Sequence, residues 1–216
     1  MTTPDAAPAD GGAVPGASRS HTARTEANSR LTATAGTVLF FLLAVQGVTI
    51  LRIHQLVGAH VVVGFALLGP LAVKVGSTGW RFARYYSGDA DYTRAGPPRP
   101  LLRFLAPLVV ATTLAVLATG IGLLFVTPGR GSVLVLLHKV TFIAWFGVMA
   151  VHVLAYVIPA WRWCLADLTG HGPPSVVATR RARQLVVGAG LAAGLSLGAV
   201  GLGWAHPWVS WFAGRP

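Results

Sequence analysis

Long blocks of apolar residues, separated by short polar and basic segments, dominate the pattern of the chain after residue 30. Five of these blocks approach the roughly 20 residues that an α-helix needs to cross a bilayer. They cover residues 31–53, 56–79, 101–126, 133–158 and 184–205. The pattern therefore predicts an all-α integral membrane protein with five transmembrane helices.

The composition agrees with a membrane protein. Hydrophobic residues make up 54% of the chain and charged residues only 11%, whereas soluble domains carry about 25% charged residues. The formal net charge is +11, but the basic residues lie between the apolar blocks, where membrane proteins carry their topology signals. We therefore expect a lipid bilayer and no nucleic acid as the partner. The single cysteine, Cys164, excludes an internal disulfide, a cysteine-ligated iron–sulfur cluster and a c-type haem attachment.

The segments outside the blocks complete the expected organisation. Residues 1–30 are rich in Ala, Pro, Gly, Thr and Ser and are predicted to be a disordered tail without a signal peptide. Residues 31–160 should form a four-helix membrane domain, 161–183 a loop, and 184–216 the fifth helix with a short tail. Pro70 should kink the second helix, and Pro159 lies near the expected end of the fourth.

The basic residues predict the orientation in the cell membrane. One side should hold twelve of them and the other only four, while Lys74 lies within a block. The side with more Lys and Arg is normally cytoplasmic, so the N-terminus should be cytoplasmic and the C-terminus extracytoplasmic. The twelve are Arg19, Arg24, Arg30, Arg81, Arg84, Arg94, Arg99, Arg103, Arg162, Arg180, Arg181 and Arg183.

Carboxylates are missing from the predicted membrane region. No Asp or Glu occurs between Glu26 and Asp89, or between Asp91 and Asp167. Proton pumps and cation antiporters usually need an acidic residue within the membrane. The sequence therefore argues against both classes.

Four ionisable side chains are expected at depth in the membrane, and their spacing is regular. His60 and Lys74 are fourteen residues apart in the second block, as are His138 and His152 in the fourth. Fourteen residues return to the same helix face about 21 Å along the axis. Because both helices should run in the same direction, His60 should meet His138 near the outer leaflet, and Lys74 should meet His152 near the inner leaflet. Each pair could ligate an iron between two facing helices.

Less specific interpretations of these residues stay open. A lone histidine in a membrane helix is more often a hydrogen-bonding group than a ligand, and Lys74 lies close enough to the helix end to snorkel to the headgroups. His54, at the turn between the first two blocks, could be a surface residue, a propionate partner or the true outer ligand. Matched depth favours a metal or haem site for His60 and His138. A haem suits two ligands better than zinc does, because zinc needs three or four protein ligands.

Two parallel helices that each present liganding residues fourteen positions apart resemble the diheme b-type membrane cytochromes. The pattern is most similar to the cytochrome b561-like and ferric-reductase-like transmembrane group, over residues 31–160. The resemblance implies a four-helix bundle in which four histidines hold two stacked haem b groups and electrons pass between the two membrane faces. His60, His138 and His152 match three of those histidines. Lys74 stands in place of the fourth, so one or two haems are expected.

Three further basic residues are candidate partners of haem propionates. Arg81 and Arg84 follow the second block and could pair with an inner haem, although interface anchoring explains them as well. Lys139, beside His138, could act in the same way at the outer haem.

The function expected from these features is electron transfer as a subunit of an oxidoreductase. The chain has no dinucleotide fingerprint of the GxGxxG type following a strand, so it should depend on a quinone or a redox protein. A small metal or solute transporter, an assembly factor and a structural anchor without haem stay open as alternatives.

The fifth block carries Gly190, Gly194 and Gly198, a spacing that lets helices approach closely. It should pack against the four-helix core or against a second copy of the chain.

Overall fold

The computed structural model describes residues 15–94, 100–130 and 132–214, and this part of the chain is helical without any strand. Five helical segments are long and apolar enough to cross a membrane, which confirms the predicted all-α membrane fold. The helices are α1 (Pro15–Leu51), α2 (Ile53–Ala66), α3 (Leu68–Tyr86), α4 (Ala90–Arg94), α5 (Pro100–Leu123), α6 (Ser132–Thr169), α7 (Pro174–Val177), α8 (Arg180–Trp204) and α9 (His206–Ala213).

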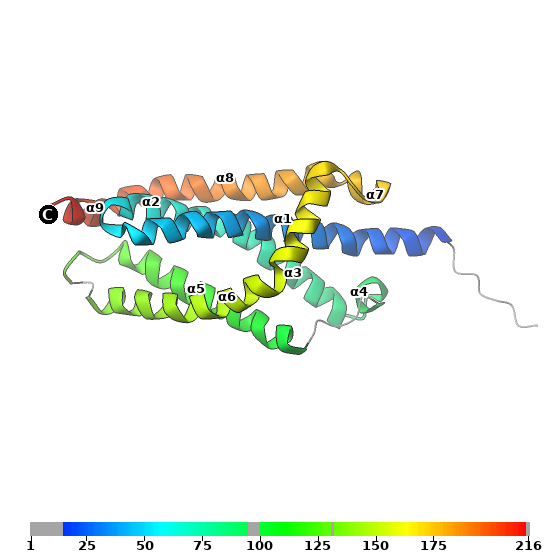
Figure 1. The fold of residues 1–216 in the computed structure, drawn as a ribbon, viewed down its shortest axis with the longest axis horizontal. Helices are drawn as coiled ribbons and strands as arrows, with labels where there is room; N and C mark the ends of the chain where they lie inside the picture. Colours follow the sequence, from blue (N-terminus) through cyan, green and yellow to red (C-terminus); the bar gives the residue numbers. More distant parts are fainter. Residues whose placement is uncertain (1–14, 95–99, 131, 215–216) are drawn as a thin grey trace, which may run out of the picture.

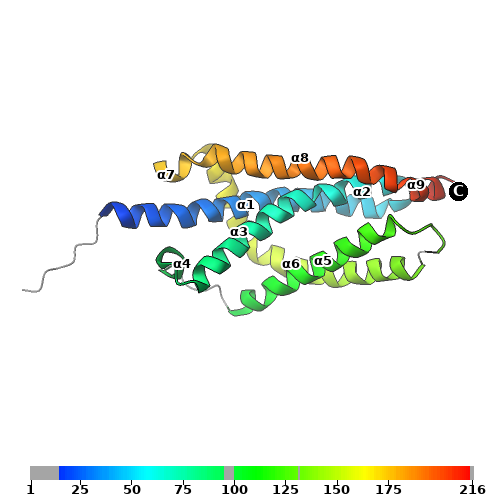
Figure 2. The ribbon, with the colours of Figure 1, turned by 180° about the vertical axis from the view of Figure 1, so that it is seen from behind.

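The long helices run roughly along one axis in two groups (Figures 1 and 2). Helix α1 packs on α2, α3 and α6, helix α8 packs on α2 and α3, and α5 packs on α6. The α1–α2 turn, the α5–α6 connection and α9 lie at one end of the molecule, which we call the outer end (Figure 1). The start of α1, α4 and α7 lie at the opposite, inner end, so the chain crosses the long axis in the predicted order.

The first helix begins earlier than the sequence predicted. Helix α1 starts at Pro15 rather than at residue 31, so the prediction of disorder is wrong for residues 15–30, while residues 1–14 lie outside the described part of the chain. Tertiary contacts explain the difference. The guanidinium of Arg30 donates to Glu26 one turn earlier and to the backbone carbonyl of His171 at 2.7 Å, and it stacks over the Trp163 ring.

The fourth membrane helix is longer than predicted. Helix α6 continues to Thr169 with Pro159 inside it, and its last part turns toward α7 (Figure 1). Most of the predicted loop 161–183 is therefore helix. The same helix also carries Asp167, which lies beyond the predicted membrane block at residues 133–158.

Asp167 forms a buried ion pair with Arg183 of α8 through its Oδ1 atom, while its Oδ2 atom is buried without a hydrogen-bond partner among the described residues. The two side chains are 1% and 6% exposed. Two guanidinium nitrogens of Arg183 donate to Asp167 Oδ1, and the third donates to the Val176 carbonyl and the Thr179 hydroxyl. This network joins α6, α7 and α8 at one corner of the molecule.

The second membrane helix continues from α2 into α3 through Leu67, whose backbone dihedrals are helical and whose N–H donates to the Val63 carbonyl at 3.1 Å. Pro70 lies three residues later and has no N–H to donate to the carbonyl of Ala66, which lies four residues before it. The helix loses one backbone hydrogen bond at this point, where it should be weakened.

Helix α8 packs against the chain's own α2 and α3 through glycines, which is one of the two arrangements that the sequence left open. A Cβ at Gly69 would overlap the Gly190 carbonyl, and one at Gly198 would lie 2.8 Å from the carbonyl oxygen of Val62. Gly194 meets the Phe65 and Ala66 carbonyls just as closely. Backbone-to-backbone contact of this kind tolerates no side chain.

The charge bias predicts which end faces the cytoplasm. A reporter fused after Pro216 should report an extracytoplasmic location, and one inserted in the 95–99 segment should report a cytoplasmic location, because twelve basic residues flank the inner end. Alkaline phosphatase and green fluorescent protein fusions measure this directly. The reverse pattern would contradict the assigned orientation.

The buried ion pair should be a main source of stability. Arg183→Gln should lower the free energy of unfolding by about 3–5 kcal/mol, because it leaves the Asp167 carboxylate buried without its partner. Unfolding in detergent measures the difference. Arg181→Gln is the matched control, since Arg181 is exposed. Equal stability of the two variants would contradict the importance of the pair.

Candidate functional site

His60 of α2 and His138 of α6 meet inside the bundle, toward its outer end. Their ring centroids are 6.4 Å apart and the ring planes are almost perpendicular, at 87°. Both side chains are partly buried. The predicted meeting of these two residues is confirmed, whereas their role as ligands stays a prediction.

Helix α1 supplies the hydrogen-bond partners of His60. The Thr49 hydroxyl lies 2.9 Å from Nδ1. The amide nitrogen of Gln46 lies 3.1 Å from Nδ1 and 3.2 Å from Nε2, and it also donates to the His60 backbone carbonyl at 3.1 Å. The amide oxygen of Gln46 is buried and has no hydrogen-bond partner in the described part of the chain.

Helix α5 supports His138 in a similar way. The Thr119 hydroxyl lies 3.1 Å from Nδ1, and it is also 3.2 Å from the Thr141 hydroxyl one turn after the histidine. Gly120 lies directly against the ring, because a Cβ at this position would be 3.0 Å from Cε1 of His138. The glycine therefore makes room for the imidazole between α5 and α6.

The spacing of the two imidazoles fits a shared metal ion. Two imidazoles that bind one metal from opposite sides, each through a bond of about 2.0–2.1 Å, place their ring centroids a little over ~6 Å apart. Among the described residues there is no group of three or more His, Cys, Asp or Glu side chains that could hold a metal. Two axial imidazoles alone suit a group that fills the other coordination positions itself, as a porphyrin does, so the residues present fit a haem.

Lys74 of α3 and His152 of α6 are the predicted inner pair. Their charges interact electrostatically, and the structure shows no direct contact between the two side chains among the described residues. Its Nζ lies against α1, where a Cβ at Gly36 would be only 2.7 Å away. The described residues provide no hydrogen bond or ion pair to this amine. The His152 ring also contacts Tyr156, with the ring centroids 4.9 Å apart.

Arg84 is already engaged by other groups. It forms an ion pair with Asp89, and its guanidinium lies 5.5 Å from the centroid of the Trp80 ring. The backbone N–H of Asp91, at 2.9 Å, and more weakly the Arg84 charge lower the pKa of the Asp89 carboxyl below its usual value. Asp89 thus stays ionised and the pair persists at neutral pH. This arrangement matches the anchoring interpretation of Arg84 better than the propionate interpretation.

The other two candidate propionate partners are exposed. Arg81 lies near the inner pair, since its charge acts on Tyr156. Lys139 follows His138 on α6 and is exposed as well. Of these two arginines, Arg81 has no ion-pair partner among the described residues, which leaves it available to bind an anion near Tyr156.

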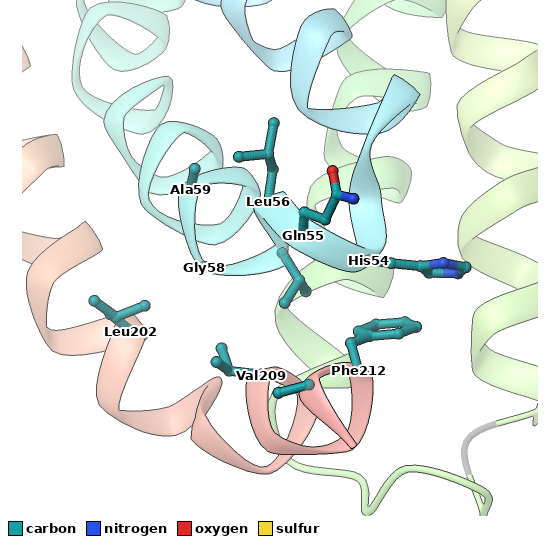
Figure 3. Close-up of a pocket in the computed structure, with 10 residues that line it drawn as sticks. His54, Gln55, Leu56, Gly58, Ala59, Leu202, Val209 and Phe212 are labelled. Carbon is teal, nitrogen blue, oxygen red and sulfur yellow. The ribbon is translucent and has the colours of Figure 1, made fainter. Parts of the chain in front are cut away.

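His54 does not reach the imidazole pair. It is exposed and stacks on Phe212 of α9, with ring centroids 4.9 Å apart. It lines an open cavity of about 570 Å³ between the start of α2, the end of α8 and α9 (Figure 3). The structure thus pairs His60, not His54, with His138, in agreement with the surface interpretation of His54.

Sequence reasoning missed the residues that hold the imidazoles. Gln46 and Thr49 are three residues apart, which places them on one face of α1, and they are polar residues in an otherwise apolar stretch. Such residues are candidate partners within a membrane. Their pairing with His60 could not be read from spacing, because it depends on how α1 rotates against α2.

Comparison of the chain with protein-family models, with curated proteins and with solved structures gives no match. The assignment of a function therefore depends on the residues and their geometry.

Proposed function

We propose that the chain is a haem b membrane cytochrome that carries electrons across or within the cell membrane as a subunit of a redox system. The single observation that carries this proposal is the 6.4 Å spacing of the His60 and His138 rings. The two ligands come from different helices and face each other inside the apolar part of the chain. Such a pair suits a cofactor held in the core of a helix bundle.

The residues of the chain have simple tasks in this proposal. His60 and His138 would hold the cofactor between α2 and α6. The apolar helices exclude water, which helps to set the reduction potential of the iron. When bound, the haem supplies one-electron chemistry, which the amino acids of the site cannot provide.

A second haem at the inner end is part of the proposal. Lys74 and His152 are supported as its ligands by the electrostatic interaction between them and by their fourteen-residue spacing from His60 and His138. His152 lies fourteen residues after His138, about 21 Å along a straight helix. Two haems at these positions would connect the outer and inner ends of the bundle. Exposed Arg81 is the candidate partner of an inner propionate.

The proposed activity requires partners on both sides. Without a dinucleotide-binding motif, the chain cannot take a hydride from a nicotinamide, so a quinone or a redox protein must deliver and remove electrons.

The visible absorption spectrum of the purified protein is the first test of the proposed function. A reduced-state haem b spectrum supports the proposal. A colourless protein from cells with ample haem would contradict the proposal, and a transporter, an assembly factor or a structural anchor would be the remaining function classes.

Removing either outer ligand should have the same effect. His60→Ala and His138→Ala should each abolish the same haem signal, because each removes one of two bonds to one iron. Reduced-minus-oxidised spectra and haem content measure the loss.

The matched control for this pair is His54→Ala, which removes an exposed imidazole from the same helix as His60. Its spectrum should equal that of the wild type. If His54→Ala abolished the signal and His60→Ala preserved it, the ligand would be assigned to the wrong turn of α2.

The role of Lys74 as the inner ligand can be tested by replacing it with side chains that can or cannot bind iron. Lys74→Arg should abolish the inner haem signal and spare the outer one, because a guanidinium stays charged and cannot donate a lone pair to iron. Lys74→His should retain both haems, with an altered spectrum and potential of the inner one. Two unperturbed haems in Lys74→Arg would show that Lys74 is not a ligand.

A further inference from the structure

Both imidazoles of the outer site are held through the same ring atom. Thr49 of α1 meets Nδ1 of His60 at 2.9 Å, and Thr119 of α5 meets Nδ1 of His138 at 3.1 Å. The two threonines come from different helices, and neither of these helices carries an imidazole of the pair. The outer site thus has a matching hydroxyl support on each side.

Each of these hydroxyl groups has a backbone carbonyl to which it can donate its proton. The Thr49 hydroxyl donates to the Gln46 carbonyl at 2.6 Å, and the Thr119 hydroxyl donates to the Ala115 carbonyl at 2.8 Å. A hydroxyl has one proton and two lone pairs. Each threonine therefore turns a lone pair toward its histidine and accepts a hydrogen bond from it.

This assignment determines the tautomer of both rings. A neutral imidazole has one N–H, and the nitrogen that hydrogen-bonds the neighbouring acceptor carries it. Nδ1 of His60 and of His138 must then be protonated, and each Nε2 has a free lone pair. Nε2 is the ring nitrogen farther from the helix backbone, so the lone pairs lie at the ends of the side chains.

The amide of Gln46 lies beside both nitrogens of the His60 ring. Its nitrogen can only donate, and it lies 3.1 Å from Nδ1 and 3.2 Å from Nε2. With Nδ1 protonated, Nε2 is the ring acceptor that remains for this amide.

We infer that Thr49 and Thr119 are positioning residues of the outer haem site, which fix both histidines in the Nδ1–H tautomer and tune the iron. The inference rests on the proposed function and deepens it. A hydrogen bond from the distal N–H of a ligating imidazole raises the basicity of the ligand. Stronger donation favours ferric iron, so both threonines should lower the reduction potential of the outer haem.

The test compares Thr49→Val and Thr119→Val with the serine variants at the same positions. Valine keeps the shape and removes the acceptor, while serine retains the hydroxyl. Thr112→Val is the matched control, because the Thr112 hydroxyl bonds only to carbonyls of its own helix in the described part of the chain, at 2.8 and 3.3 Å. A general defect in helix packing would affect the control as well.

The first measurement needs no cofactor. Imidazole nitrogen NMR of the haem-free protein, above the titration of its histidines, should show His60 and His138 with the proton on Nδ1. Each valine variant should move the proton of its own histidine toward Nε2, whereas the serine variants and Thr112→Val should not. Wild-type tautomers in both valine variants would overturn the inference.

The second measurement uses the haem-loaded protein. Each valine variant should raise the midpoint potential of the outer haem and weaken haem retention by about 10- to 100-fold, and the serine variants should restore both. Unchanged potential and retention in the valine variants would overturn the tuning role while leaving the proposed function intact. A wild-type protein that binds no haem would instead overturn the proposed function.

Discussion

Polar side chains within a bilayer must find their hydrogen-bond partners inside the protein, because the hydrocarbon offers none. This constraint accounts for the interior of the bundle. Threonine hydroxyls from α1 and α5 bind the two outer imidazoles, and the Trp145 indole of α6 donates to Thr113 of α5 at 3.0 Å. Each of these bonds joins two helices, so the polar groups that the site requires also determine how its helices are oriented.

The same constraint explains why the fifth membrane helix carries glycines where it contacts α2 and α3. Helix α8 carries no imidazole, and the apolar surface of a helix gains little by leaving lipid for protein. Its contact with α2 and α3 instead uses close approach of the backbones, at Gly190 against Gly69 and at Gly198 against Val62. A rigid contact behind α2 holds the helix that carries His60, which gives α8 an indirect part in the geometry of the outer site.

The sequence predicted the fold and the meeting of the outer histidines because both depend on local periodicity. Apolar runs have a length that reports a membrane span, and fourteen residues return to one helix face whatever the neighbours do. Contacts between distant segments could not be predicted in this way. Arg30 extends α1 by binding the His171 carbonyl, and Asp167 is tolerated at the end of α6 because Arg183 meets it.

The nitrogen groups at the two ends of the bundle differ in their partners. At the outer end a threonine hydroxyl meets each imidazole, although the Gln46 amide oxygen there is buried without a partner among the described residues. The amine of Lys74 at the inner end has no hydrogen-bond or ion-pair partner in the same part of the chain. Burying an unpaired ammonium costs several kcal/mol. An amine avoids this cost by being neutral or by pairing with an anion. The proposed inner haem accounts for either state, because its iron binds a neutral amine and its propionate pairs with a charged one.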